Sequence, residues 1–164
     1  MITIWRHGPE VIDELRPLWL AMTHHHHEVA PELGPIYDDD ETWSRRRTHY
    51  EDTLNRPGSF ALIAWDDDRP VGYATVLIEE NRSPSWPVPD RYADLDSLAV
   101  APDARGQGIG EALVAHVQDE VEKEGISEVR VWAVSANTRA LAFYERLGFV
   151  PQFTALRREQ RPGA

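Results

Sequence analysis

A glycine-rich stretch, Arg105-Gly106-Gln107-Gly108-Ile109-Gly110, constrains this chain more than any other segment. An apolar run of strand character, residues 95–100, precedes it. An amphipathic run follows, and its apolar residues share one helical face: Ile109, Leu113, Val117 and Val121. A strand that turns through glycines into a helix leaves backbone N–H groups free at the positive end of the helix dipole. The pattern therefore predicts a binding site for a phosphorylated ligand.

The spacing of the glycines narrows the kind of phosphate site. A Walker A loop requires Lys-Ser or Lys-Thr after its last glycine, and neither follows Gly110. A dinucleotide fingerprint requires G-x-G-x-x-G, which glycines at 106, 108 and 110 do not satisfy. The stretch matches Q/R-x-x-G-x-G/A, in which the missing Cβ atoms let the backbone approach a pyrophosphate and Arg105 adds a charge-assisted contact. Taken alone, it is also compatible with an ordinary tight turn between a strand and a helix.

A second motif lies downstream, at residues 137–149. These residues read Asn-Thr-Arg-Ala-Leu-Ala-Phe-Tyr-Glu-Arg-Leu-Gly-Phe and match N-x-x-A-x-x-x-Y-x-x-x-G-F at every specified position. Each match also has an ordinary structural interpretation: Asn137 as a helix N-cap, Tyr144 as a packing residue and Gly148 as a helix stop. Together and in this order, the two motifs resemble the coenzyme A signatures of the GNAT acyltransferase family.

Hydrophobic periodicity and turn residues predict the order of elements. The order is one strand, two helices, three strands, a helix, a strand, a helix and one or two C-terminal strands. Strands are predicted at 3–6, 59–65, 71–79, 94–100, 128–134 and within 149–158. Helices are predicted from Pro9 with a break near Arg16, from an N-cap at Asp40, and at 108–124 and 137–147. Residues 23–39 and 81–92 are predicted as loops.

The family resemblance implies a fold that fits this order. It is an α/β (α+β) fold with a mixed, mostly antiparallel central sheet of six to seven strands and four helices. Strands four and five run parallel and splay apart, and the acyl-CoA lies in the gap. We expect one domain over residues 1–160, followed by a flexible tail at 161–164.

Composition excludes several classes of protein. The chain has 164 residues, 41% of them hydrophobic, and six Trp, which predicts a packed core and not disorder. It has no Cys, no signal-peptide pattern and no apolar run of transmembrane length, which favours a cytoplasmic protein. A net charge of −11 disfavours nucleic acid or an anionic membrane as a partner and is compatible with a cationic amine.

The resemblance implies acetyl-CoA as co-substrate and acyl transfer to a primary amine of a small molecule or peptide, by direct attack in a ternary complex. The matching cofactor-binding positions are Leu98, Ala99, Val100, Arg105, Gly106, Gln107, Gly108, Ile109, Gly110, Asn137, Arg139, Ala140 and Tyr144. Backbone N–H groups of residues 98–100 would stabilise the oxyanion. Tyr144, with an ordinary pKa near 10, would protonate the leaving thiolate.

The sequence leaves more than one candidate for the general base. Strand alternation places Asp94, Asp96, Leu98 and Val100 on one face. Asp96 is the candidate base or water-orienting residue, with Asp94 second, and the alternative is that both carboxylates only solvate the start of the strand.

Three further groups of residues have open interpretations. His24–His27 cannot all face one ion, so no metal site is predicted, although one of them could contact substrate or act as a base. Arg45–Arg47 form a solvated helical face unless one of them meets an acceptor carboxylate. Trp86 and Tyr92 either wall the acceptor site or anchor their loop against the core.

Two functional alternatives remain at this point. One is a catalytically silent acyl-CoA-binding sensor or scaffold, and the other is an enzyme that uses a longer acyl donor. Homodimers are common in the family, so a homodimer is one expected assembly.

Overall fold

The computed structural model of the chain describes residues 1–82 and 84–158. Residues 161–164, where the sequence predicts a flexible tail, lie outside the described residues. The strands are β1 (Ile2–His7), β2 (Phe60–Asp66), β3 (Arg69–Glu80), β4 (Arg91–Val100) and β5 (Val129–Val131). The α-helices are α1 (Arg16–Val29), α2 (Asp39–Leu54), α3 (Ile109–Lys123) and α4 (Thr138–Arg146). Three 3₁₀ turns are η1 (Pro9–Leu15), η2 (Pro31–Leu33) and η3 (Pro102–Ala104).

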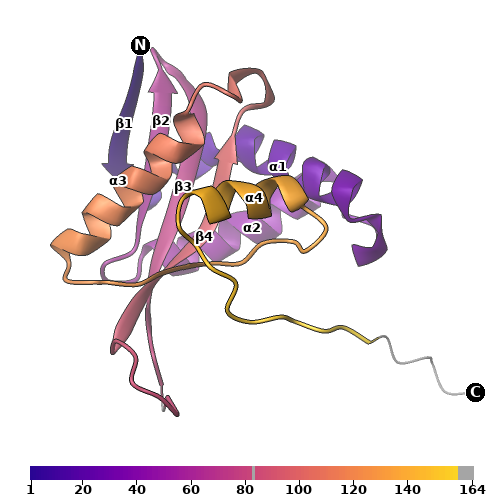
Figure 1. The fold of residues 1–164 in the computed structure, drawn as a ribbon. Helices are drawn as coiled ribbons and strands as arrows, with labels where there is room; N and C mark the ends of the chain where they lie inside the picture. The colour runs from indigo at the N-terminus through magenta and orange to yellow at the C-terminus, as the bar shows by residue number, and fades with distance from the viewer. Residues whose placement is uncertain (83, 159–164) are drawn as a thin grey trace, which may run out of the picture.

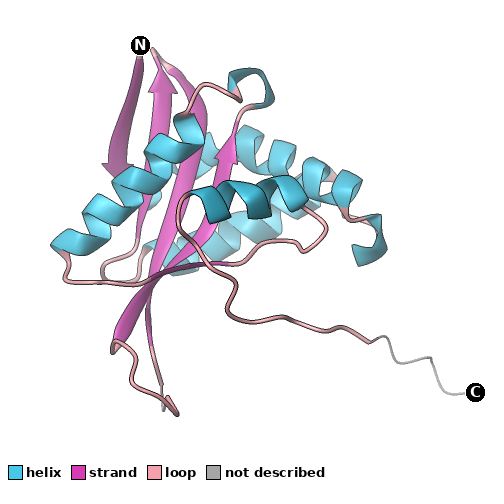
Figure 2. Ribbon diagram, viewed as in Figure 1, coloured by secondary structure: helices cyan, strands magenta, loops and turns pink. Residues whose placement is uncertain are grey.

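The five strands form one sheet in the order β1-β2-β3-β4-β5. Strands β1 to β4 pair antiparallel, and β4 pairs with β5 in parallel. Helices α3 and α4 cover one face of the sheet, and α1 and α2 cover the other (Figures 1 and 2). This is the mixed, mostly antiparallel sheet with four helices that the family resemblance implies.

The sheet is buried between the two helical layers. Residues 60–64 of β2 are buried on both faces, as expected for a central strand that helices cover on each side. Leu15 and Tyr50 are fully buried on the α1–α2 side, and Leu113 and Val117 on the α3 side. The predicted apolar face of α3 is confirmed, since Ile109, Leu113, Val117 and Val121 are all buried.

Strand β4 extends well beyond its parallel partner. Ala93–Leu95 pair with Val129–Val131, while residues 96–100 continue without a partner on the β5 side. The chain after β5, residues 132–137, instead leads into α4 without strand pairing. The end of β4 therefore has one free edge beneath α4, and this edge is where the predicted ligand site lies.

The first helical segment breaks where the sequence predicts but is longer than predicted. The 3₁₀ turn η1 ends at Leu15 and α1 begins at Arg16, beside Pro17. The predicted loop at residues 23–29 is wrong, because α1 runs through all four histidines to Val29. Histidine is an adequate helix residue, whereas Pro31 forces Ala30 out of helical geometry (φ −137°) and thereby ends the helix.

The N-cap of α2 is Asp38, and the predicted cap at Asp40 is wrong. The Asp38 carboxylate accepts a hydrogen bond of 2.9 Å from the backbone N–H of Glu41. Asp38 and Glu41 have the spacing of a capping box, so the sequence itself contains the signal for this helix start. Asp40 lies in the first turn and forms an ion pair with Arg16.

The C-terminal strands are the other wrong prediction, and they account for the five strands found where six to seven were expected. Residues 149–158 form a loop, which leads away from the sheet in Figure 1. Pro151 has no N–H for a ladder, and in a strand Phe153 would face opposite to Val150 and Leu156, so the three apolar residues would not form one face. All three side chains are exposed. None of the described helices is long and apolar enough to cross a membrane.

Candidate functional site

A cavity of about 700 Å³ lies along the free end of β4. Its lining includes almost every predicted cofactor-binding residue: Leu98, Ala99, Val100, Arg105, Gly106, Gly108, Ile109, Gly110, Asn137, Arg139, Ala140 and Tyr144. Gln107 is the exception, because it is exposed and lines a smaller cavity between β1 and α3. Two motifs from distant parts of the sequence thus meet at one cavity.

Backbone conformation favours glycine at two of the three glycine positions in this loop. Gly106 and Gly108 adopt φ values of 78° and 79°, a left-handed conformation that favours glycine, and a Cβ on either would meet no atom within 4 Å. Gly110 has ordinary geometry, but a Cβ there would approach the Phe143 ring at 3.4 Å. The first two positions therefore shape the turn, while an added methyl group at the third would make an ordinary contact with Phe143.

The start of α3 is open to an anion. Gly108 is the N-cap and supplies no side-chain cap, so the first N–H groups of the helix have no capping side chain. The Nε of Arg105 donates to the Val100 carbonyl at 3.3 Å, which holds the guanidinium beside this helix end. Backbone donors, the helix dipole and an arginine thus converge on one edge of the cavity, an arrangement that fits a pyrophosphate.

Helix α4 supplies the residues of the second motif. The Asn137 side chain caps the helix by accepting a hydrogen bond from the Ala140 N–H at 3.1 Å, as its interpretation as an N-cap predicts. Asn137 also lines the cavity. Tyr144 packs edge-on between Phe143 and Phe149. Burial raises the pKa of the Tyr144 phenol to about 12, so the phenol carries its proton across the neutral pH range.

Strand β4 carries a β-bulge at the position that matters most for the predicted base. Thr75 pairs with Ser97 and Val76 pairs with Leu95, which leaves Asp96 as the extra residue. Asp96 and Ser97 consequently both face α2. The predicted face shared by Asp94, Asp96, Leu98 and Val100 is therefore wrong: across the bulge, Leu98 and Val100 turn toward the α3 side.

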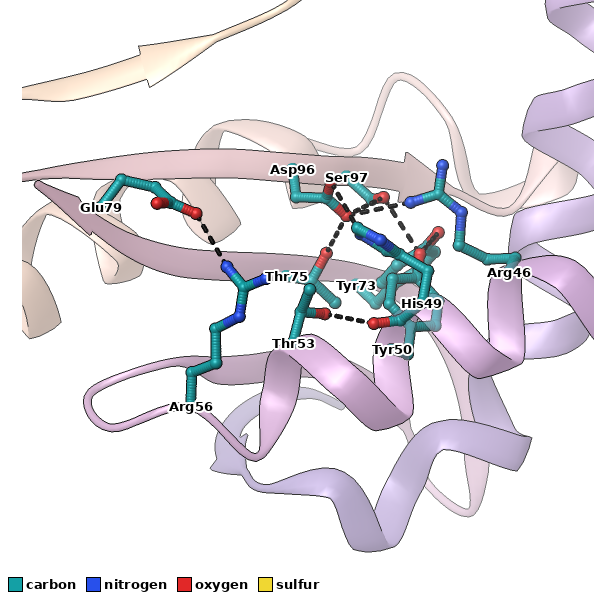
Figure 3. A network of polar contacts seen from close by, with 10 residues as sticks. All are labelled: Arg46, His49, Tyr50, Thr53, Arg56, Tyr73, Thr75, Glu79, Asp96 and Ser97. Atoms are coloured by element: carbon teal, nitrogen blue, oxygen red, sulfur yellow. Dashed lines mark hydrogen bonds and ion pairs between the residues drawn. The ribbon is translucent and has the colours of Figure 1, made fainter.

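Asp96 lies at the centre of a polar network that links β4 to α2 (Figure 3). Its Oδ2 accepts from Arg46 at 3.0 Å, Ser97 at 3.2 Å and Thr75 at 3.4 Å. Its Oδ1 contacts His49 Nε2 at 3.2 Å. The carboxylate is thus fixed in place, and one lone-pair position on Oδ1 remains for a further donor.

Two buried tyrosines, Tyr50 and Tyr73, support this network from the protein interior. The Tyr50 hydroxyl donates to Ser97 Oγ at 3.0 Å and lies 3.0 Å from the Tyr73 hydroxyl. Burial raises the pKa of both phenols, and most strongly that of Tyr73. Both rings therefore stay neutral, and their hydroxyls serve to hold Ser97 and, through it, Asp96.

Asp94 has a different environment. Burial, together with the nearby charges of Asp96 and Glu79, raises its pKa to about 6, and its Oδ1 has no hydrogen-bond partner among the described residues. Asp94 does not lie among the described residues that line the cavity. A raised pKa alone therefore does not make it a base for chemistry there.

The far end of the cavity is lined by the first two helices: Trp19, Met22, His25, His26 and Arg46. Burial, with the neighbouring His25, lowers the pKa of His26, which keeps that imidazole neutral at pH 7. His24 instead turns to Asp39, at 2.7 Å. No three His, Asp or Glu side chains gather as metal ligands in the part of the chain that the structure describes.

Trp86 and Tyr92, the other predicted candidates for the acceptor end, lie elsewhere. Trp86 is 58% exposed, and the Tyr92 ring stacks against Arg130. Neither is among the described residues that line the cavity. Helices α1 and α2 line this end of the cavity instead, and sequence reasoning missed Trp19 and Met22, whose helical spacing indicated only core packing. Arg46 belongs to the run Arg45–Arg47, for which contact with an acceptor carboxylate was one of the two open interpretations.

Comparison with known proteins supports the assignment that the two motifs suggested. The family model described as "Acetyltransferase (GNAT) family" matches residues 19–149. A [ribosomal protein bS18]-alanine N-acetyltransferase of Escherichia coli (strain K12) is 44% identical over 57 residues, 35% of this chain and 38% of that protein. A mycothiol acetyltransferase of Kocuria rhizophila is 32% identical over 133 residues, 80% of this chain and 41% of that protein.

Solved structures agree on the fold. The aminoglycoside N-acetyltransferase AAC(6')-Iy in complex with CoA superposes with a TM-score of 0.71 at 19% identity, over 99% of this chain and 96% of that one. The alignments span about two fifths of the length of the two curated relatives. Because the family model covers most of the chain, and both of its motifs line the same cavity, the chain belongs to the GNAT acetyltransferase family.

Proposed function

We propose that this protein is an N-acetyltransferase that moves an acetyl group from acetyl-CoA to a primary amine, by direct attack in a ternary complex. One observation carries the proposal: a single cavity joins the glycine loop at α3, Tyr144 on α4 and Asp96 on β4. A donor bound at one end and an acceptor at the other would meet inside it. The curated relatives are named as a ribosomal-protein-alanine N-acetyltransferase and a mycothiol acetyltransferase, and these names support the same reaction class.

The donor would lie with its pyrophosphate at the N-terminus of α3, held by backbone N–H groups and Arg105. Arg139 and Arg146 also line the cavity and would add positive charge for the phosphates. The acyl-bearing arm would then follow the free edge of β4. Among residues 98–100, the backbone N–H groups that point to the free edge and not to β3 would be donors for the thioester oxygen.

The chemistry requires two proton movements. The amine loses a proton before or as its nitrogen attacks the thioester carbonyl, and Asp96 would receive it directly or through a water held at Oδ1. When the tetrahedral intermediate collapses, the C–S bond breaks and the sulfur takes a proton from the Tyr144 hydroxyl. Burial keeps the Tyr144 phenol protonated at neutral pH, so a proton is available for this step.

The test is thiol release from acetyl-CoA across a panel of primary amines, with the acetylated product identified by mass spectrometry. We expect product and free thiol in equal amounts, and a higher rate with acetyl-CoA than with longer acyl-CoAs. Tight coenzyme A binding with no thiol release on any amine would contradict the proposal and favour a silent acyl-CoA-binding module.

The Tyr144→Phe variant tests the assigned acid. We expect kcat to fall by roughly 100-fold, the lower range for general acid catalysis, while the dissociation constant of coenzyme A stays the same. Tyr92→Phe is the matched control, since Tyr92 packs on Arg130 away from the cavity. An unchanged kcat in Tyr144→Phe would remove Tyr144 from the mechanism.

A further inference from the structure

The three consecutive arginines of α2 have three different environments. Arg45 pairs with Glu41 on the helix surface. Arg47 pairs with Asp13 and Glu51, also at the surface. Arg46 alone faces the cavity, where it lines the acceptor end. Arg46 is therefore placed to contact a ligand, and substitutions of Arg45 or Arg47 can serve as controls.

Arg46 and Asp96 form a fixed pair of opposite charges at the acceptor end. Their side chains lie 3.0 Å apart and remain 23% and 17% exposed, and both line the cavity. The Arg46 guanidinium stacks on the Trp19 ring at 3.8 Å and lies 5.3 Å from that of Tyr50, which restrains its orientation. A cation and an anion thus stand side by side in a preorganised arrangement (Figure 3).

At this end of the cavity, Arg46 has more hydrogen-bond donors than the described residues supply acceptors for. Within the described residues, the hydrogen bond from Nη1 to Asp96 is the only one that Arg46 makes, which leaves Nε and Nη2 available. Arginine can only donate, so a ligand that contacts Arg46 here must bring acceptor atoms such as carboxylate oxygens.

We propose that the acceptor is a free α-amino acid, which docks as a zwitterion on the Arg46–Asp96 pair. Its carboxylate meets the free N–H groups of Arg46, and its amino group meets Asp96. Amine and carboxylate of an α-amino acid are separated by one carbon, which suits two receptor groups that are themselves in hydrogen-bond contact. This inference rests on the proposed acetyltransferase function and specifies its acceptor.

The charges around the cavity oppose a polycationic acceptor. Although the chain carries a net charge of −11, the described acidic residues that line the cavity are Asp96 and Glu111. The lining arginines are Arg46, Arg105, Arg139 and Arg146. Asp96 is already paired with Arg46, so the acceptor end has no surplus negative charge for several ammonium groups.

The neighbouring surface favours a neutral, apolar side chain on the amino acid. Trp19 and Met22 from α1 line the cavity next to Arg46, with the neutral imidazole of His26 beside them. Met22 is a flexible, polarisable side chain that adapts to unbranched or aromatic groups. L-Methionine is therefore a suitable probe acceptor.

The experiment compares three amines of nearly equal size: L-methionine, L-methioninamide and 3-(methylthio)propylamine. They carry a carboxylate, a neutral amide and no carbonyl group, respectively. We expect kcat/KM for L-methionine to exceed that of the other two by roughly 10- to 100-fold, the range for charge-assisted hydrogen bonds. Equal rates on all three would overturn the inference while leaving the acetyltransferase proposal intact.

Variants of the arginine run assign the effect to one residue. In Arg46→Gln, we expect the preference for L-methionine over 3-(methylthio)propylamine, measured as the ratio of their kcat/KM values, to disappear, whatever the change in either rate. Arg46→Lys should restore part of the preference, and Arg45→Gln should keep all of it. A preference unchanged in Arg46→Gln, or an equal loss of activity on every amine, would overturn the inference. If no amine yields product in the parent protein, both proposals fail together.

Discussion

Single residues in this molecule carry distinct physical roles that a motif alone does not separate. Gly108 and Gly110 belong to the same pattern, yet only the first has a positive φ, and a Cβ on the second would make an ordinary contact with Phe143. Asn137 is both a helix cap and a cavity residue. A substitution in such a motif therefore changes stability and binding together, and a useful test must separate the two.

Gly108 offers that separation because Gly125 matches it in geometry. Both residues have positive φ values, 79° and 72°, and a Cβ on either would meet nothing within 4 Å. Replacement by Val should cost each variant roughly 1–3 kcal/mol of folding free energy through backbone strain. Only Gly108→Val should also lose coenzyme A binding, because its β-branched side chain occupies the approach to the α3 N-terminus.

Isothermal titration calorimetry with coenzyme A, after urea unfolding has confirmed that both variants fold, measures the two effects. Equal coenzyme A affinity in Gly108→Val and Gly125→Val would place the pyrophosphate away from this loop.

Asp94 gives a prediction on pH. Its pKa is raised from 3.8 to about 6 in the folded protein, so the folded state holds the proton more tightly than the unfolded state does. Stability is then unaffected below pH 3.8, falls as pH rises toward 6 and stays lowered above it. Asp94→Asn removes this loss, and because solvent screens a partly exposed site, we expect a gain of about 1 kcal/mol at pH 8.

Urea unfolding of Asp94→Asn and the parent protein at pH 4.5 and pH 8 measures the gain, which should shrink at the lower pH. Asp119→Asn, at an exposed position on α3, is the control. A gain that is the same at both pH values would show that ionisation of Asp94 is not its cause.

At the scale of elements, local signals determined the helices better than the strand ends. The Asp38–Glu41 capping pattern and Pro31 fix the start of α2 and the end of α1. The prediction placed both boundaries wrongly because it took Asp40 as the cap and assigned the four histidines to a loop. The C-terminal segment and the short β5 were harder, since strand formation depends on a partner edge that no local pattern specifies.

The cap of α2 is testable against the residue that the sequence suggested. Asp38→Ala removes the hydrogen bond to the Glu41 N–H and should lower the free energy of unfolding by about 1 kcal/mol. Asp40→Ala removes a solvent-exposed ion pair with Arg16 and should cost less than half as much. Asp38→Asn should restore most of the loss. Chemical denaturation distinguishes the three, and equal losses for the two Ala variants would contradict the cap assignment.

At the scale of the whole molecule, the two ends of the cavity differ in how far the sequence predicted them. The donor end comes from contiguous motifs, in which glycine spacing and a helix start carry their own chemistry. The proposed acceptor end joins Trp19, Arg46 and Asp96 from α1, α2 and β4, and its geometry depends on the bulge that turns Asp96 toward α2. A bulge comes from the pairing of two strands, so simple alternation along one strand could not predict it.

The free end of β4 leads to a prediction about the protein as a whole. Residues 96–100 lack a partner on the β5 side, and the segment after β5 is unpaired as well, so this side of the sheet is held by few backbone hydrogen bonds. Coenzyme A bound between the free end of β4 and the segment after β5 would connect these two parts of the chain. At a ligand concentration 100-fold above its dissociation constant, we expect about 2.7 kcal/mol of stabilisation, or an increase in Tm of roughly 5–10 °C.

Hydrogen exchange then locates the effect. Protection should increase at residues 97–100, 105–111 and 131–140, while β1 and β2, on the opposite side of the sheet, should change little. Gly108→Val should show neither the increase in Tm nor the protection, which separates specific binding from general stabilisation by ligand. Protection spread evenly over all strands, or confined to β1 and β2, would mean that the free edge of β4 is not the donor site, because a ligand bound there must shield the unpaired backbone first.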